Sequence, residues 1–139
     1  DLEINEYLRK RPAYGDSTDV SAQISTLNYF GLKAKFVSWG TAEKLKAQID
    51  RGRPAPVGWL HNGPVSSPTG GGHYSVVTGY DDKTEMWIHN DSNGRADLVH
   101  GGYVTVGSGG ETVAYSYKNW NPRWMVEGTG SGWGLDIWK

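Results

Sequence analysis

Residues 70–81 read Gly-Gly-Gly-His-Tyr-Ser-Val-Val-Thr-Gly-Tyr-Asp, and residues 86–91 read Met-Trp-Ile-His-Asn-Asp. Each stretch is rich in β-branched and aromatic residues, and a short turn separates them, so together they predict a β-hairpin with strands over 74–80 and 85–89. His73 precedes the first strand, and Asp91 follows the second. Because the two strands of a hairpin return to the same edge of a sheet, we expect His73 and Asp91 to face each other.

An imidazole held by a carboxylate is the arrangement that activates a thiol or hydroxyl nucleophile. We therefore interpret His73 as a general base and Asp91 as the residue that orients it, by accepting the Nδ1 proton of the ring. Asn90 is the alternative orienter, and residues 90–94 are also typical of a simple turn. The chain contains no cysteine. The sequence thus predicts one half of a catalytic site and lacks a thiol for the other half.

Working outward from the hairpin, residues 1–53 are predicted to be mainly helical. Three helices have apolar faces formed, in chain order, by Ile4, Tyr7 and Leu8, by Val20, Ile24 and Leu27, and by Ala42, Leu45 and Ile49. Thr18 or Asp19 is predicted to cap the second helix, and Thr41 the third. Gly31 and Gly52 are predicted to end them.

Residues 54–139 are predicted to be mainly β. Besides the hairpin, strands are expected over 55–60, 103–106 and 135–138, and residues 32–36 form a further half-buried strand with Leu32, Ala34 and Phe36 inward. Pro56 places its strand at a sheet edge or Pro56 itself at a strand start. Residues 112–126 remain ambiguous. The order of elements predicts a single α+β domain over 1–139, with helices packed on one side of an antiparallel sheet.

Composition excludes several classes of function. The formal net charge of −1 gives no basic footprint for nucleic acid, and no stretch approaches the roughly 18 apolar residues of a membrane span. No cofactor is predicted. His61, His73, His89 and Asp91 lack the spacing of a zinc motif, so no metal site is predicted either. Five tryptophans could supply stacking platforms for sugar rings: Trp59, Trp87, Trp120, Trp124 and Trp133.

The Gly-Gly-His-Tyr-Ser-Val-Val-Thr-Gly-Tyr-Asp segment, with Asp91 shortly after the following strand, resembles the C39-like group of papain-fold cysteine peptidases. Residues 45–54, a predicted helix that ends in a Gly-Arg-Pro turn before a strand, fit the same family, and the resemblance extends over roughly residues 18–94. It implies a papain-like fold and carries the roles of base and orienter onto His73 and Asp91. Trp59, His61 and Gly72 are candidate substrate contacts.

In that family the nucleophilic cysteine opens a helix some tens of residues upstream of the position of Asp1. We therefore expect an N-terminally incomplete domain, inactive alone, related to enzymes that cleave peptide bonds or peptidoglycan crosslinks. Ser66 and Ser67 match no nucleophile position. Loss of the nucleophile's helix is expected to uncover Tyr74, Val76 or Val77, and a separate copy of that segment, a partner chain or self-association would cover them. An extracellular, cell-surface or virion location is favoured.

Two alternatives remain open at this level. One is a non-catalytic papain-like module that binds peptide or cell-wall glycan. The other is a structural domain of a virion or a cell surface, which retains the Gly-Gly-His segment for packing alone.

Overall fold

The computed structural model describes residues 6, 9–15 and 19–139. The helices in this part of the chain are the 3-10 helix η1 (Arg11–Ala13) and the α-helices α2 (Val20–Tyr29), α3 (Ala42–Asp50) and α4 (Tyr117–Trp124). The strands are β1 (Lys33–Gly40), β2 (Ala55–Trp59), β3 (His73–Asp81), β4 (Met86–Asn90), β5 (Gly94–Ala96), β6 (Tyr103–Val106), β7 (Val113–Ser116) and β8 (Gly132–Trp138). The protein is α+β, as predicted.

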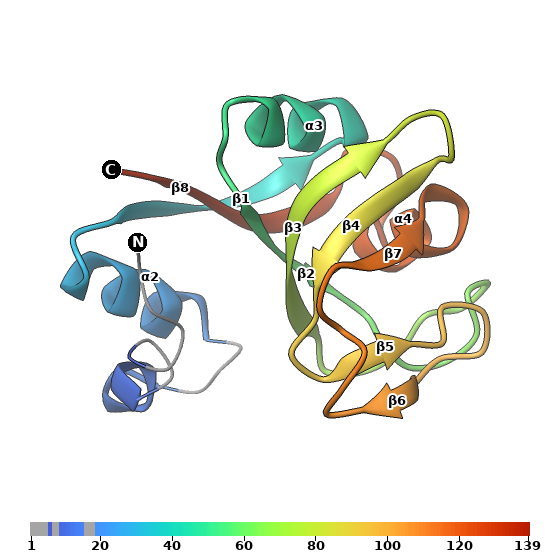
Figure 1. The fold of residues 1–139 in the computed structure, drawn as a ribbon, viewed down its shortest axis with the longest axis horizontal. Helices are drawn as coiled ribbons and strands as arrows, with labels where there is room; N and C mark the ends of the chain where they lie inside the picture. The colour runs from blue at the N-terminus through green and yellow to red at the C-terminus, as the bar shows by residue number, and fades with distance from the viewer. Residues whose placement is uncertain (1–5, 7–8, 16–18) are drawn as a thin grey trace.

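Six strands form one antiparallel sheet in the order β1-β8-β2-β3-β4-β7, and β5 pairs with β6 in a separate small sheet. In Figure 1, α2 lies beside β1 at one end of the main sheet, and β5 and β6 lie near the other end. The predicted hairpin is confirmed as β3 and β4, which pair in antiparallel register from Val76 opposite Asn90 to Asp81 opposite Met86. The strand β2 is internal, between β8 and β3, so the expected edge position is wrong and Pro56 instead lies at a strand start.

The helix predictions are confirmed in part. The Thr41 hydroxyl caps α3 by accepting the Lys44 N–H at 3.1 Å, and Leu45 is buried. Asp19 caps α2, but the buried face of α2 consists of Ala22, Gln23, Thr26 and Leu27. Of the predicted face, Leu27 is buried, and Val20 and Ile24 are only half-buried. Thr26 can be buried in their place because its hydroxyl donates to the Ala22 carbonyl within the helix. The first predicted helix, with Ile4, Tyr7 and Leu8, lies outside the described residues.

The hydrophobic core is built around tryptophans. Trp59, Trp87, Trp120 and Trp124 are at most 3% exposed and pack with Leu45 of α3 and Val57, Val77 and Tyr115 of the sheet. Four of the five tryptophans considered as sugar platforms are thus core residues, and Trp133 is half-buried. Trp133 lies over β2 at Gly58, where a Cβ would come within 1.9 Å of the indole Nε1. Glycine at this position therefore lets the ring lie flat against the strand.

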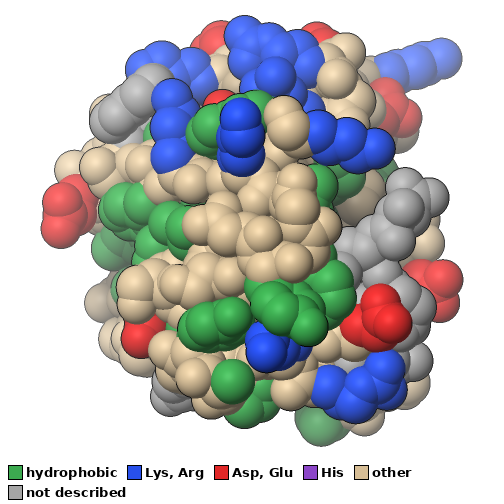
Figure 2. Space-filling view, turned by 90° about the vertical axis from the view of Figure 1, so that its left-hand side faces the viewer, with side chains coloured by type: hydrophobic (Ala, Val, Ile, Leu, Met, Phe, Trp, Pro, Cys, Tyr) green, Lys and Arg blue, Asp and Glu red, His purple; other side chains and the backbone are tan. Residues whose placement is uncertain are grey.

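Figure 2 shows the end of the molecule that carries α2 and β1. Lys and Arg side chains gather over the upper part of this face (Figure 2). On the edge strand β1, Lys33 and Lys35 are exposed, and Phe36, predicted to point inward, is 45% exposed. Lysines on an edge strand oppose pairing with another sheet. None of the described helices is both long and apolar enough to cross a bilayer.

Candidate active site

The structure brings His73 and Asp91 together. The first residue of β3 is His73, opposite Trp59 of β2, and Asp91 directly follows β4. The Nε2 atom of His73 lies 2.8 Å from Oδ1 of Asp91, and the side chains are 10% and 0% exposed. The two side chains thus face each other, as expected from the hairpin. The ring nitrogen differs: Nε2, and not Nδ1, faces the carboxylate.

The second ring nitrogen of His73 has a different neighbour. Nδ1 lies 3.3 Å from the amide nitrogen of Asn93, and an amide nitrogen can only donate. An Nε2–H tautomer satisfies both contacts, because Nε2 then donates to Asp91 and Nδ1 accepts from Asn93. In this tautomer the basic lone pair of His73 is at Nδ1, and the Asn93 amide occupies it, so Nδ1 can act as a general base only when Asn93 moves away from it.

The backbone around Asp91 fixes its position. The Asp91 N–H donates to the Gly110 carbonyl at 2.8 Å, and a Cβ on Gly110 would lie 1.9 Å from the Asp91 carbonyl oxygen. Only glycine allows so close an approach. The Asn93 N–H in turn donates to Oδ1 of Asp91 at 3.1 Å. The segment from 91 to 93 is thus a turn that also holds the carboxylate against His73.

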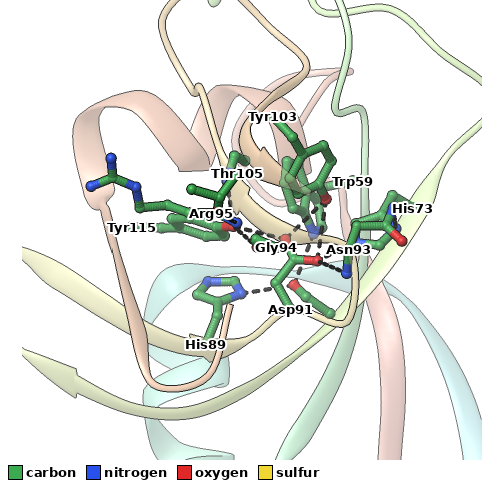
Figure 3. A network of polar contacts seen from close by, with 12 residues as sticks. Trp59, His73, His89, Asp91, Asn93, Gly94, Arg95, Tyr103, Thr105 and Tyr115 are labelled. Carbon is green, nitrogen blue, oxygen red and sulfur yellow. Dashed lines mark hydrogen bonds and ion pairs between the residues drawn. The ribbon is translucent and has the colours of Figure 1, made fainter. Parts of the chain in front are cut away.

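Two tyrosines complete the environment of Asp91 (Figure 3). The Tyr115 hydroxyl donates to Oδ2 at 2.7 Å, and the Tyr103 hydroxyl lies 2.9 Å from Oδ2 and 3.2 Å from Oδ1. Burial alone raises the pKa of Asp91, but the hydrogen bond and charge of His73, with the donors Tyr115 and Asn93, outweigh it. The pKa of Asp91 consequently lies below its ordinary value, and the group is a carboxylate at neutral pH.

Asn90, the alternative orienter, points elsewhere. Its side chain is exposed, and its Oδ1 accepts the Thr112 N–H at 2.8 Å. Successive side chains of a strand point to opposite faces. Asn90 therefore points away from the face that His89 and Asp91, its two neighbours in the chain, share. The structure therefore places Asp91, and not Asn90, against His73.

The candidate substrate contacts have different surroundings. Trp59 is fully buried and lies edge-on to the His73 ring, with centroids 5.4 Å apart, so it supports His73 from below and is not accessible for stacking. His61 is half-buried, and its ring lies 5.4 Å from that of His73. Gly72 has φ +95° and no atom within 4 Å of a Cβ position. Of the three, His61 and Gly72 lie where a bound molecule could reach them.

A buried relay lies beneath the pair. Trp59 Nε1 donates to the Ser75 hydroxyl at 2.9 Å, and Ser75 lies 2.8 Å from Nδ1 of His89. The Ser75 hydroxyl accepts the Trp59 N–H and shares one further hydrogen bond with Nδ1 of His89, as donor or as acceptor according to the tautomer of His89. Burial lowers the pKa of His89 to about 3. This histidine is neutral and supports Trp59.

Arg123 holds the loop that carries His61. The guanidinium is fully buried and donates to the carbonyls of Leu60, Asn62, Gly63 and Leu98. Sequence reasoning missed Arg123, Tyr103, Tyr115 and Asn93 as parts of this region. Ser116, the N-cap of α4, was the one local signal that could have placed the helix that carries Arg123.

The register of β3 decides between the residues that were expected to be uncovered, Tyr74, Val76 or Val77. Val77 is fully buried in the core. Tyr74 and Val76, which point to the opposite face of β3, are half-buried. Burial raises the pKa of Tyr74, consistent with partial removal from water.

A family model and a solved structure match this chain. The model of the peptidase C39-like family matches residues 5–121. A crystal structure described as a "putative C39-like peptidase" from Bacillus anthracis matches with a TM-score of 0.53 at 14% sequence identity, over 86% of this chain and 58% of that one. At that identity the likeness shows a shared fold, and this chain spans less than two thirds of that protein's length. No curated protein matches. The family match covers most of the sequence, and the chain belongs to the peptidase C39-like family.

Proposed function

We propose that this chain carries the base and orienter of a cysteine-peptidase active site, with His73 as the general base and Asp91 as its orienter. The observation that carries the proposal is the buried 2.8 Å contact from Nε2 of His73 to Asp91. In the matching tautomer Nδ1 is the ring atom that accepts a proton, once the Asn93 amide at 3.3 Å has moved away from it. Membership of a C39-like peptidase family supports the same reaction class.

The proposed reaction needs a thiol from outside these 139 residues, which contain no cysteine. Among the described residues, the groups in hydrogen-bond contact with the ring nitrogens of His73 are Asp91 and Asn93, and neither is a nucleophile. The Ser75 hydroxyl is committed to Trp59 and His89. Serine chemistry on His73 therefore has no candidate in the described residues.

The chemistry follows from the tautomer. Nδ1 of His73 accepts the thiol proton, and the thiolate attacks the carbonyl carbon of an amide bond. The resulting imidazolium gives that proton to the departing amine as the carbon–nitrogen bond breaks, and water then hydrolyses the thioester with His73 again as base. Asp91 holds Nε2–H throughout and stabilises the imidazolium. The proposed substrate class is a peptide or a peptidoglycan crosslink.

The test compares His73→Ala with His100→Ala in the protein carrying every residue that its gene encodes. We expect His73→Ala to lower kcat/KM for a peptide or muropeptide substrate by roughly 10²–10⁴-fold, because a general base contributes about that much. The His100 ring also contacts an aspartate, Asp97, at 3.1 Å, but its side chain is 82% exposed. His100→Ala should therefore retain full activity.

The 139-residue chain by itself should hydrolyse neither substrate, since the base has no thiol to deprotonate. Turnover by this chain would exclude the cysteine mechanism. Binding of muropeptide without turnover in the full gene product would favour the non-catalytic module. Absence of both binding and turnover would favour the structural domain.

A further inference from the structure

The Asp91 carboxylate has more hydrogen-bond donors than the orientation of a histidine requires. Its side chain is 0% exposed, so no donor is supplied by bulk water. Oδ1 receives His73 Nε2 and the Asn93 N–H, and Oδ2 receives the hydroxyls of Tyr103 and Tyr115. The two tyrosines come from β6 and β7, elements that contribute neither member of the pair.

The direction of the Tyr115 hydrogen bond is fixed by its second partner. The Ala96 N–H points at the Tyr115 oxygen from 3.0 Å, and a backbone N–H can only donate. The single hydroxyl proton must then go to an acceptor, either Oδ2 of Asp91 at 2.7 Å or the Gly94 carbonyl at 3.4 Å. The shorter bond to the charged oxygen prevails. Tyr115 is therefore a committed donor to Oδ2.

Tyr103 is the second hydroxyl donor to the carboxylate. Its hydroxyl bridges both oxygens, at 2.9 and 3.2 Å, and its ring stands edge-on to His73 with centroids 5.9 Å apart. Burial and the neighbouring carboxylate raise the pKa of Tyr103 and Tyr115 above the ordinary tyrosine value. Both phenols therefore remain protonated and able to donate.

We propose that Tyr115 and Tyr103 are positioning residues of the His73–Asp91 pair, which fix the rotation of the Asp91 carboxylate so that Oδ1 faces Nε2 of His73. Without the two hydroxyls, both remaining donors, His73 and the Asn93 N–H, would hold Oδ1 alone. The carboxylate could then turn more freely about its Cβ–Cγ bond and allow the ring to adopt the other tautomer. With Oδ2 held by two hydroxyls, rotation breaks two further hydrogen bonds. This inference rests on the proposed function of His73, but its first test does not require activity.

The first experiment uses the 139-residue chain and the ¹⁵N resonances of the His73 ring, which report the tautomer. We expect the wild type to hold the neutral ring as Nε2–H. The double variant Tyr103→Phe/Tyr115→Phe should show a mixture with Nδ1–H and faster exchange of the Nε2 proton with solvent. Tyr80→Phe is the matched control, because its hydroxyl also donates to a carboxylate, Asp50, at 2.8 Å, but in an exposed setting.

A purely structural role for the tyrosines predicts another result. The double variant would then unfold at a lower temperature than the wild type and keep the wild-type tautomer and exchange rate in its folded state. That result would overturn the proposal. The single variants distinguish the two hydroxyls, and we expect Tyr115→Phe to have the larger effect because its bond is shorter and fully buried.

The second experiment measures kinetics in the full gene product. Each single variant, Tyr103→Phe or Tyr115→Phe, should lower kcat roughly 3- to 10-fold through the loss of one hydrogen bond to Asp91. KM should stay unchanged, because the tyrosines act on the base and not on the substrate. If the tyrosine variants keep the wild-type kcat while His73→Ala is strongly impaired, the positioning role is overturned and the proposed function of His73 is not. Wild-type activity in His73→Ala would overturn the proposed function while the tautomer result still stands.

Discussion

Two histidine–aspartate pairs occur in the described structure, and they differ in nearly every respect. His73 and Asp91 are 18 residues apart, the first on β3 and the second directly after β4 of the main sheet, with side chains 10% and 0% exposed. His100 and Asp97 are three residues apart in one turn, with side chains 82% and 33% exposed. In the turn, Asp97 also accepts the backbone N–H groups of Val99 and His100.

The comparison shows that contact between an imidazole and a carboxylate does not by itself indicate a catalytic site. In the turn, chain geometry brings the two groups together, and water surrounds the imidazole. In the sheet, distant segments converge on Asp91 and exclude water from it. Because water is excluded, each hydrogen bond to Asp91 is electrostatically stronger, and a missing partner is more costly. Burial and convergence therefore distinguish the two pairs.

The largest difference is expected in stability. Asp91→Ala removes the acceptor of His73, Tyr103 and Tyr115 at once and leaves buried donors unpaired, so we expect a loss of about 3–5 kcal/mol in the free energy of unfolding. Asp97→Ala removes an exposed turn acceptor and should lose about 1 kcal/mol. Urea denaturation of both variants measures the two losses. Equal losses would show that the Asp91 network contributes no more than a surface turn.

A third histidine sharpens the comparison through pH. Burial lowers the pKa of His89 from 6.5 to about 3, so between these values the unfolded chain binds a proton at this residue and the folded protein does not. The free energy of unfolding must then fall as the pH is lowered through this window, by up to about 1.4 kcal/mol per pH unit. Below about pH 3 both states are protonated and this slope ends.

Replacement of His89 by Gln should reduce that slope by the contribution of one proton. His100→Gln, which removes a histidine from the surface, serves as the control. Urea denaturation in steps between about pH 7 and pH 4 gives the slope for each protein. A wild-type slope in His89→Gln would mean that His89 takes up its proton in the folded protein at ordinary pH, and that the relay through Ser75 is open to water.

Much of the fold could be predicted from local sequence signals. The cap at Thr41, the apolar spacing of α3 and the alternation of β3 and β4 all act over a few residues, and the structure confirms these elements. The short strand β5 was not predicted, and α4, which contains Pro122, lay in the ambiguous region. Their conformations depend on partners distant in sequence, such as β6 for β5, which no local pattern specifies.

The residues of the candidate site also differ in how far they could be predicted from local sequence. His73 and Asp91 could be paired from the sequence because a single hairpin connects them. Tyr103 and Tyr115 could not, since their approach to Asp91 depends on the pairing of β6 with β5 and of β7 with β4. The choice of ring nitrogen also required the structure, because strand direction alone does not fix which edge of an imidazole turns to the carboxylate.

The smallest expected difference lies in the response of the two pairs to salt. Double-mutant cycles at mildly acidic pH, with alanine at each position, give the coupling energy of each pair. For His100 and Asp97 we expect about 0.2–1 kcal/mol, reduced towards zero in 1 M NaCl, where the screening length is only about 3 Å. For His73 and Asp91 the coupling should be larger and should change little with salt, because ions cannot enter a site in which the carboxylate is fully buried. If the same salt reduced both couplings in proportion, the His73–Asp91 site would be open to solvent, and burial could no longer explain why this pair, and not the one in the turn, is the candidate active site.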